Sequence, residues 1–272
     1  MINNTVNNET SPDCEIIPIN NNLLLRLTRP AKLNAITKPI LLSLQACIDQ
    51  LERPDQDQAK QKILIISAAG SKAFCAGTDL AETATMTKAE RETKTIMARD
   101  LLVRLSRSRV ISVAAINGLA FGGGMELAMA CTFRVAAAHA TFSLPEIKLG
   151  LLPAYGGTQF LPPLIGKARA LEMMLTGKVI DAAEAHDIGL VNRLAPVYAL
   201  LDASVALARE VTRFSPLAIQ AIRDCVAVAG GDVSDEGLKV EDHAVRKVFT
   251  SEDAQEGIAA FLEKRPAVFK GL

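Results

Sequence analysis

One pattern constrains the fold of this chain more than any other: a short apolar strand, then a glycine-containing loop, then a helix, at least twice over. Residues 62–67 contain Ile63-Leu64-Ile65-Ile66, a β-branched run typical of a strand buried on both faces. Residues 110–116 predict a second such strand, followed by Gly122-Gly123-Gly124 and a helix over 125–131. With a third core strand expected over 134–138, the pattern indicates a layered α/β core.

The N-terminal part shows simpler local signals. Residues 1–14 are rich in Asn and are predicted to form a flexible tail, and two β-type runs within 15–27 predict a hairpin. Residues 38–53 predict a helix, and Thr87 with Glu90 spells a capping box at the start of another. The first of these helices is predicted because its apolar residues share one face: Ile40, Leu41, Leu44, Cys47, Ile48 and Leu51.

The C-terminal part is predicted to be helical. Beyond Pro153 strand signals fade, except over 190–194. Prolines and glycines then divide the remainder into a run of four helices from about 196 to the end. We therefore expect a core over 15–195 and a helical C-terminal region over 196–272.

Composition excludes several classes of protein. The 272 residues include 30 Lys and Arg and 30 Asp and Glu, so the formal net charge is zero, which argues against general electrostatic binding to nucleic acid or to an anionic membrane. The five cysteines are scattered without a CxxC pair and indicate reduced thiols instead of a disulfide framework or a zinc site. Residues 1–14 contain no Lys or Arg, so we expect no signal peptide or presequence, and a soluble cytoplasmic protein.

Two loops indicate where chemistry takes place. The first is Ala76-Gly77-Thr78-Asp79 and the second is Gly122-Gly123-Gly124, each expected directly after a buried strand. Glycines allow close approach of a ligand to the backbone, and the first amides of a helix are free to hold an anion or a developing oxyanion. A phosphate loop is disfavoured, because neither Gly-Lys-Ser/Thr nor GxGxxG spacing is present. A tight strand-to-helix turn remains an alternative for the triple glycine.

Two glutamates accompany these loops. Glu126 lies in the first turn of the helix that the glycines open, among small apolar residues where burial of a carboxylate is costly unless it is compensated. Its alternative role is to complement the helix dipole. Glu146 follows the next strand and Pro145, and its alternative is a solvent-exposed loop residue. Since parallel strands bring successive loops to one edge of a sheet, the two carboxyl groups are expected to meet.

These stretches together resemble the crotonase (enoyl-CoA hydratase/isomerase) superfamily. The resemblance covers about residue 15 to the C-terminus, with the motifs in the family's order and spacing. The matching stretches are Phe74-Cys75-Ala76-Gly77-Thr78-Asp79-Leu80, Asn117-Gly118-Leu119-Ala120-Phe121-Gly122-Gly123-Gly124-Met125-Glu126-Leu127-Ala128, Phe142-Ser143-Leu144-Pro145-Glu146-Ile147-Lys148-Leu149-Gly150, Gly156-Gly157-Thr158-Gln159 and Leu175-Thr176-Gly177.

The resemblance implies a fold and a reaction. The fold is an α/β spiral of ββα units with a helical C-terminal region that forms a homotrimer or a dimer of trimers. The substrate is an acyl-CoA, so coenzyme A is part of the substrate and no separate cofactor or metal is expected. The backbone amides of Thr78 and Gly123 would form an oxyanion hole, Glu126 would activate water, and Glu146 would protonate C2.

The resemblance also assigns residues to the binding of CoA. These are Lys32, Ala35, Ala76, Asp79, Leu80 and Lys264. Two positions depart from the family pattern, because Phe160 stands where Arg is frequent and Ala154 where Gly is frequent. Neither change removes a catalytic group. Tyr155 is expected either to shape the acyl pocket or to belong to the core.

Several activities compete within this reading. Hydration of a 2-enoyl-CoA is favoured because both glutamates are present, whereas a 3,2-enoyl-CoA isomerase can work with one. A dehydratase of a specialised acyl-CoA would use the same pair. Decarboxylases, dehalogenases and ring-forming members depend on other groups and rank lower. From another class, a non-catalytic RNA-binding or scaffolding protein is the alternative.

Overall fold

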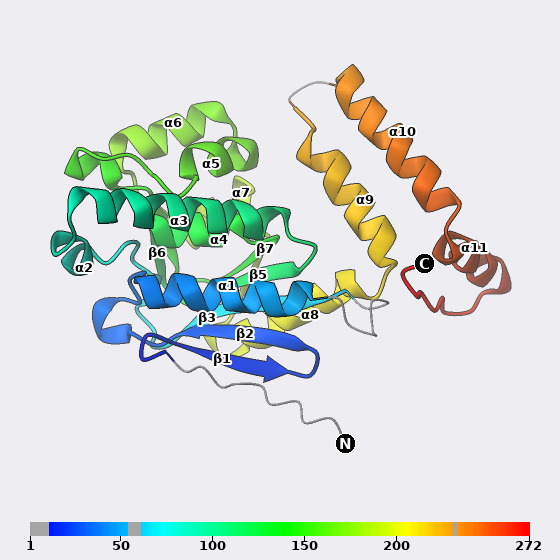
Figure 1. The fold of residues 1–272 in the computed structure, drawn as a ribbon, viewed down its shortest axis with the longest axis horizontal. Coiled ribbons are helices and arrows are strands. Elements are labelled where there is room, and N and C mark those ends of the chain that lie inside the picture. The colour runs from blue at the N-terminus through cyan, green and yellow to red at the C-terminus, as the bar shows by residue number, and fades with distance from the viewer. Residues whose placement is uncertain (1–10, 54–60, 231–232) are drawn as a thin grey trace. The chain divides into compact units, whose positions relative to one another are not determined.

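The computed structural model describes residues 11–53, 61–230 and 233–272, which form two compact units (Figure 1). The first unit comprises the described residues of Met1–Glu52 and Ile63–Ala206, and the second those of Arg53–Lys62 and Leu207–Leu272. The division falls within helix α8 (Leu200–Thr212). Each unit is described by itself below.

The larger sheet of the first unit contains the predicted core strands. Its order is β1 (Cys14–Ile19), β2 (Asn22–Leu27), β3 (Ile63–Ala68), β5 (Ile111–Ile116), β7 (Phe133–Ala137) and β10 (Arg193–Ala195). The first two strands form the predicted antiparallel hairpin, and the later neighbours pair in parallel. Every residue of β5 is buried, as expected for a strand covered on both faces.

A second, smaller sheet was not predicted. It contains β4 (Ala73–Cys75), β6 (Leu119–Phe121), β8 (Thr141–Ser143) and β9 (Ile180–Asp181), in that order. The first three of these strands each follow a strand of the larger sheet and precede a helix, which confirms the expected succession of ββα units. Each glycine loop directly follows a strand, as expected, but that strand is β4 or β6 and not the predicted strand of the larger sheet. Strands this short carry too little alternation to be recognised in a sequence.

Helices cover the sheets of the first unit. The elements along the chain are η1 (Pro30–Lys32), α1 (Lys38–Glu52), α2 (Leu80–Ala84), α3 (Lys88–Arg107), α4 (Gly123–Ala130), η2 (Glu146–Leu149), α5 (Gly157–Ile165), α6 (Lys167–Thr176), α7 (Ala182–Asp187) and η3 (Val197–Ala199). The apolar face predicted for α1 is confirmed, since all six of its residues are buried in the core. The capping box at Thr87 and Glu90 is present at the start of α3, which runs beside α1 (Figure 1).

Some predicted boundaries need correction. Of the predicted tail, residues 1–10 lie outside the described residues, whereas Cys14 is fully buried as the first residue of β1. The strand predicted over 190–194 is β10, which begins only at Arg193. The helix predicted from Met125 begins two positions earlier, at Gly123, so that the glycines themselves form its first turn.

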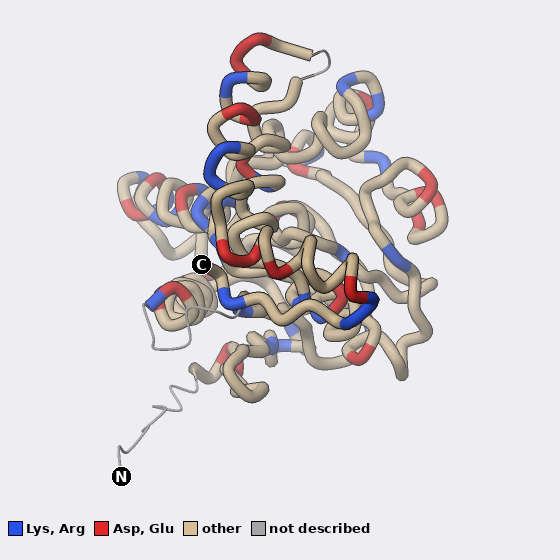
Figure 2. The backbone as a smooth tube through the Cα atoms, turned by 90° about the vertical axis from the view of Figure 1, so that its right-hand side faces the viewer, with Lys and Arg blue, Asp and Glu red and all other residues tan. Residues whose placement is uncertain are grey.

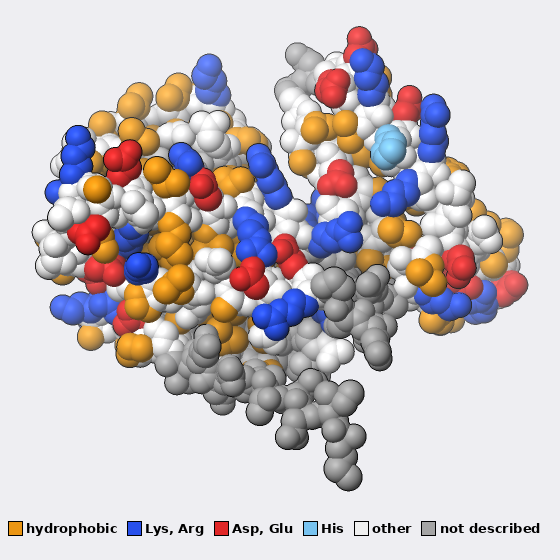
Figure 3. Space-filling model, viewed as in Figure 1, with side chains coloured by type: hydrophobic (Ala, Val, Ile, Leu, Met, Phe, Trp, Pro, Cys, Tyr) orange, Lys and Arg blue, Asp and Glu red, His pale blue; other side chains and the backbone are white. Residues whose placement is uncertain are grey.

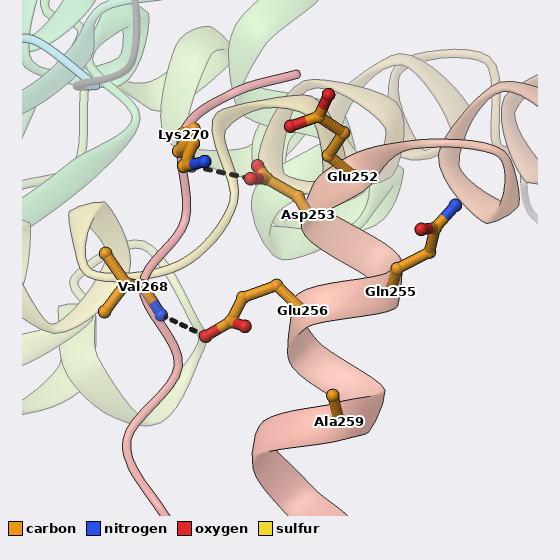
Figure 4. Close-up of a pocket in the computed structure, with 7 residues that line it drawn as sticks. All are labelled: Glu252, Asp253, Gln255, Glu256, Ala259, Val268 and Lys270. Atoms are coloured by element: carbon orange, nitrogen blue, oxygen red, sulfur yellow. Dashed lines mark hydrogen bonds between the residues drawn. The ribbon is translucent and has the colours of Figure 1, made fainter.

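The second unit is helical, and the prediction of four helices after residue 196 is confirmed within the described residues. They are α8, which begins in the first unit, and α9 (Pro216–Ala227), α10 (Asp235–Phe249) and α11 (Glu252–Glu263) in the second. Carboxylate side chains of α11 bind the backbone of the C-terminal segment, which runs beside this helix (Figure 4). Asp253 accepts a hydrogen bond from the Lys270 amide at 2.6 Å, and Glu256 accepts one from the Val268 amide at 2.9 Å.

Charged residues of both signs are interspersed along the part of the chain that the structure describes (Figure 2). Within the described residues, no helix combines the length and the apolar character needed to cross a bilayer.

Candidate active site

Three loops meet at one edge of the smaller sheet. Strands β4, β6 and β8 are parallel neighbours, so their carboxyl ends lie at the same edge. Thr78 follows β4, Gly123 follows β6 and Glu146 follows β8. The expectation that the sheet brings these loops together is confirmed, with the difference that the smaller sheet does so.

The Thr78 loop is held by a short parallel bridge to Ile36. The Ile36 amide donates to the Gly77 carbonyl at 2.7 Å, and the Asp79 amide donates to the Ile36 carbonyl at 3.0 Å. This bridge uses the residues on either side of Thr78 and leaves the Thr78 amide out of the ladder. Gly123 opens α4, where first-turn amides have no acceptor inside the helix. A Cβ atom placed on Gly123 would lie 3.5 Å from the Thr78 nitrogen, so the two amides are neighbours.

The glycines of the second loop are needed because neighbouring atoms leave no room for a Cβ atom. Gly122 has a φ of 51°, which favours glycine, and a Cβ atom there would lie 2.8 Å from Oε1 of Glu146. A Cβ atom on Gly124 would lie 2.2 Å from the Cys75 carbonyl oxygen. The turn interpretation of the triple glycine is therefore confirmed: the turn is tight, and it places backbone beside a carboxyl group.

Glu126 is almost fully buried, with 1% of its surface exposed. Its Oε1 accepts hydrogen bonds from the amides of Tyr155 at 2.8 Å and Gly157 at 2.7 Å, which compensate for the burial. Burial is the main cause of a rise in the pKa of Glu126 to about 8; the charge of Glu146 contributes to this rise, and the two amides oppose it. Burial therefore favours the protonated form of Glu126.

Glu146 is the second carboxyl group of the site. It begins η2 and is half-buried, with Oε1 close to the Cα of Gly122. Its Oε2 is buried and makes no hydrogen bond within the part of the chain that the structure describes. Burial raises the pKa of this group above its ordinary value. Because the Glu146 charge acts on Glu126, the two groups titrate as an interacting pair.

Hydrogen bonds and ion pairs of charged residues stabilise the residues next to Thr78. The carboxylate of Asp79 caps α2 by accepting the Glu82 amide at 3.0 Å, and it accepts a 2.8 Å hydrogen bond from Arg29. These hydrogen bonds lower the pKa of Asp79. The buried ammonium group of Lys94 pairs with Glu82 and donates to the Ile36 carbonyl at 3.4 Å. Both segments of the bridge beside Thr78 are thereby held, one through Asp79 and the other through the Ile36 carbonyl.

The residues expected to contact CoA fall in both units. Those in the first unit are Lys32, Ala35, Ala76, Asp79 and Leu80. The segment that contains Ala35 lies beside the segment that contains Ala76 and Thr78, because the Ala76 amide donates a hydrogen bond to the Leu33 carbonyl at 3.0 Å. Lys32 and Leu80 are exposed, whereas the Asp79 carboxylate is committed to the loop. Lys264 belongs to the second unit, where it ends α11 with a left-handed φ of 54°.

Other side chains that could react are buried or already hydrogen-bonded. Burial raises the pKa of Cys75 to about 12, so its thiol is not an activated nucleophile. The described residues contain no group of three or more His, Cys, Asp or Glu side chains arranged to hold a metal ion. A pocket in the second unit is lined by carboxylates of α11 (Figure 4), but Asp253 and Glu256 are engaged by backbone amides and Arg265.

Comparisons with known proteins agree with this arrangement. The family model described as enoyl-CoA hydratase/isomerase matches residues 19–272. The chain belongs to this family. The match covers both ββα loops, the two glutamates and the helical C-terminal region.

Individual relatives of the family are moderately similar. The probable enoyl-CoA hydratase echA8 of Mycobacterium tuberculosis (strain CDC 1551 / Oshkosh) is 39% identical over 246 residues, covering 90% of this chain and 93% of that protein. The enoyl-CoA isomerase/hydratase fer4 of Mycosarcoma maydis is 35% identical over 252 residues, covering 91% and 92%. The crystal structure of an enoyl-CoA hydratase from Bacillus anthracis superposes with a TM-score of 0.87 at 34% identity, over 96% of this chain and all of that one. These names include both hydratases and isomerases.

Sequence reasoning missed part of the site. It did not predict that the amides of Tyr155 and Gly157 hold Glu126, or that the hydroxyl groups of Thr78 and Tyr155 meet at 2.6 Å. The signal available was the position of Tyr155 immediately before the matching stretch Gly156-Gly157-Thr158-Gln159.

Proposed function

We propose that this protein is an enoyl-CoA hydratase that adds water across the C2=C3 double bond of a 2-enoyl-CoA. The observation that carries the proposal is the pairing of Glu126 with Glu146 beside the neighbouring amides of Thr78 and Gly123. The amides supply two donors for the thioester oxygen, and the carboxyl groups supply one proton acceptor and one proton donor.

The reaction needs one shared proton on the glutamate pair. A water O–H bond breaks as its oxygen bonds to C3, and the ionised carboxylate takes that proton. The π electrons of the double bond move toward the thioester, whose oxygen is stabilised by the two amides, and C2 then receives a proton from the protonated carboxyl group. One water is added, no electrons are lost, and the pair again carries one proton.

We assign water activation to Glu126 and protonation of C2 to Glu146. Without substrate we place the shared proton on Glu126, because it is the more buried carboxyl group and its pKa is raised. The form required for hydration has the same net charge and differs by the transfer of one proton from Glu126 to Glu146. The form with the shared proton on Glu126 is the one in which Glu146 can remove a proton from C2 of a saturated acyl-CoA.

This division of roles is tested by proton exchange. Butyryl-CoA in D₂O should exchange its C2 protons with wild-type protein. Glu126→Gln should retain this exchange while losing hydration, because Glu146 alone is needed at C2. Glu146→Gln should lose both activities. The opposite pattern, with exchange lost only in Glu126→Gln, would reverse the two roles.

The reaction type is tested with a panel of CoA esters. Crotonyl-CoA and longer 2-enoyl-CoA esters should lose the absorbance of the conjugated thioester as water is added. A matched panel of 3-enoyl-CoA esters tests the isomerase alternative, which is favoured by the isomerase names among the relatives. Faster conversion of 3-enoyl-CoA than hydration of 2-enoyl-CoA would replace hydratase by isomerase.

We further infer that the protein assembles as a trimer or a dimer of trimers. The second unit exposes large apolar side chains between its charged ones (Figure 3), including Ile222, Val226, Phe249, Phe261 and Leu262. Exposed apolar surface of this extent is typical of an interface between subunits. Light scattering with sedimentation measures the mass, and a stable, fully active monomer would contradict the assembly.

A further inference from the structure

Tyr155 is a buried residue to which the reaction described above assigns no part. It has 4% of its surface exposed, on the segment between η2 and α5. Its hydroxyl oxygen accepts a 2.6 Å hydrogen bond from Oγ1 of Thr78, and its amide donates a 2.8 Å hydrogen bond to Oε1 of Glu126. One residue therefore joins the loop carrying the first oxyanion donor to a carboxyl group of the glutamate pair.

The ring of Tyr155 also reaches the second oxyanion donor. A Cβ atom placed on Gly123 would lie 2.9 Å from both Cδ2 and Cε2 of the ring. That distance is shorter than a normal contact, so the ring packs directly against the Cα of Gly123. Tyr155 thus touches Thr78, in the loop after β4, and both Gly123 and Glu126, in the first turn of α4.

The hydroxyl pair has a clear physical role. A buried phenol requires a hydrogen-bond partner, and Thr78 supplies it at a distance typical of a good O–H···O bond. Burial raises the pKa of Tyr155 to about 12, so the group stays neutral and acts through position instead of proton transfer. The bond restrains the Thr78 side chain, and through it the orientation of the Thr78 amide.

We propose that Tyr155 is a positioning residue whose hydroxyl bond to Thr78 fixes the oxyanion hole relative to Glu126. This inference rests on the proposed function, because it concerns the thioester that the two amides would hold. Misplacement of an oxyanion donor weakens stabilisation of the transition state more than binding of the CoA ester. Loss of the bond should therefore lower kcat and leave KM nearly unchanged.

The experiment removes the bond from each side. Tyr155→Phe deletes the acceptor, Thr78→Val deletes the donor while keeping the backbone amide, and Thr78→Ser keeps the hydroxyl. We expect each of the first two variants to lower kcat for the preferred CoA ester by about 3- to 10-fold, the effect of one net hydrogen bond. Thr78→Ser keeps the hydroxyl donor and should recover most of the kcat lost in Thr78→Val, and the double variant Tyr155→Phe/Thr78→Val should fall no further than either single.

A matched control and a spectroscopic readout separate positioning from folding. Tyr198, the second of the two tyrosines, is 91% exposed, so Tyr198→Phe should change nothing. A bound cinnamoyl-CoA absorbs at longer wavelength when its carbonyl is polarised, and this shift should be smaller in Tyr155→Phe and Thr78→Val than in wild type. Melting temperatures establish that the variants fold; if Tyr155→Phe does not, the comparison of Thr78→Val with Thr78→Ser tests the same bond.

The outcomes distinguish this inference from the proposed function. Wild-type protein inactive toward every 2-enoyl- and 3-enoyl-CoA ester would overturn the proposed function, and the spectral shift would still decide the role of Tyr155. Active wild-type protein with an unchanged kcat and spectral shift in Tyr155→Phe would overturn this inference alone. If the fold-losses in kcat of the two single variants multiply in the double variant, this inference would also be overturned. Two residues that act through one shared hydrogen bond lose that bond only once.

Discussion

The amide of Gly157 donates a 2.7 Å hydrogen bond to Oε1 of Glu126, across a separation of 31 residues in sequence. This bond and the one from Tyr155 allow a carboxyl group to lie in an apolar helix that would otherwise exclude it. Both hydrogen bonds are accepted by Oε1 of Glu126, and they thereby fix the orientation of its Oε2. The geometry of the pair with Glu146 therefore depends on the segment before α5 as much as on α4.

Conversion of either glutamate to glutamine should stop hydration. Glu126→Gln and Glu146→Gln each keep the size of the side chain but remove its ability to take up or give up a proton, and each should lower crotonyl-CoA hydration by about 10²-fold or more. The double variant should lose far less than the product of the singles, because groups that act as a unit are not additive. Initial rates measure this, with the exposed Glu92→Gln as an unaffected control. A mild effect of Glu126→Gln beside a severe effect of Glu146→Gln would indicate an isomerase.

The oxyanion hole is tested at Gly123 with two substitutions. Gly123→Ala keeps the amide but places a Cβ atom against the Tyr155 ring, whereas Gly123→Pro adds the same atom and removes the N–H donor. Proline is compatible with the first position of a helix, so folding is expected to survive. The Pro variant should be slower than the Ala variant by about 10²-fold, the cost of one donor. Equal turnover in the two folded variants would exclude the Gly123 amide from the reaction.

Activity should depend on pH through the shared proton. Burial raises the pKa of Glu126 to about 8, so above that pH the pair loses its proton and no longer donates one to C2. The value of kcat/KM for crotonyl-CoA should therefore fall as pH rises beyond about 8, and also at acidic pH where both carboxyl groups are protonated. Initial rates across this range measure the profile. A kcat/KM that stays level well above pH 8 would contradict a one-proton pair.

Stability should also depend on pH, with a definite sign. The pKa of Glu126 is raised from 4.5 to about 8 in the folded protein, so between these values the folded state binds more protons than the unfolded state. The free energy of unfolding should therefore decrease as pH rises through this window. Glu126→Gln cannot titrate, and its stability should decline less over the same interval. Urea unfolding below about pH 8.5 measures the difference, because the buried cysteines contribute only above their ordinary value of 9.0. Parallel declines in both proteins would assign the effect to other groups.

Local patterns in the sequence were sufficient for much of the fold. The apolar face of α1, the hairpin of β1 and β2 and the capping box of α3 each depend on residues within a few turns of one another. Such features are encoded by spacing, and spacing can be read from one chain. The order and spacing of the motifs around Glu126 and Glu146 were likewise sufficient to indicate the family, which the comparisons show.

Tertiary structure alone decided the second sheet and the connections within the site. Strand β6 is three residues long and is defined by its parallel partners β4 and β8, so no local pattern predicts it. The bond between Thr78 and Tyr155 spans 77 residues, and the raised pKa of Glu126 depends on burial and on amides far away in sequence. The sequence by itself determined which groups are present. Their distances, hydrogen bonds and protonation arise from contacts that form only when the ββα units pack together, because desolvation and hydrogen bonding depend on neighbours in space.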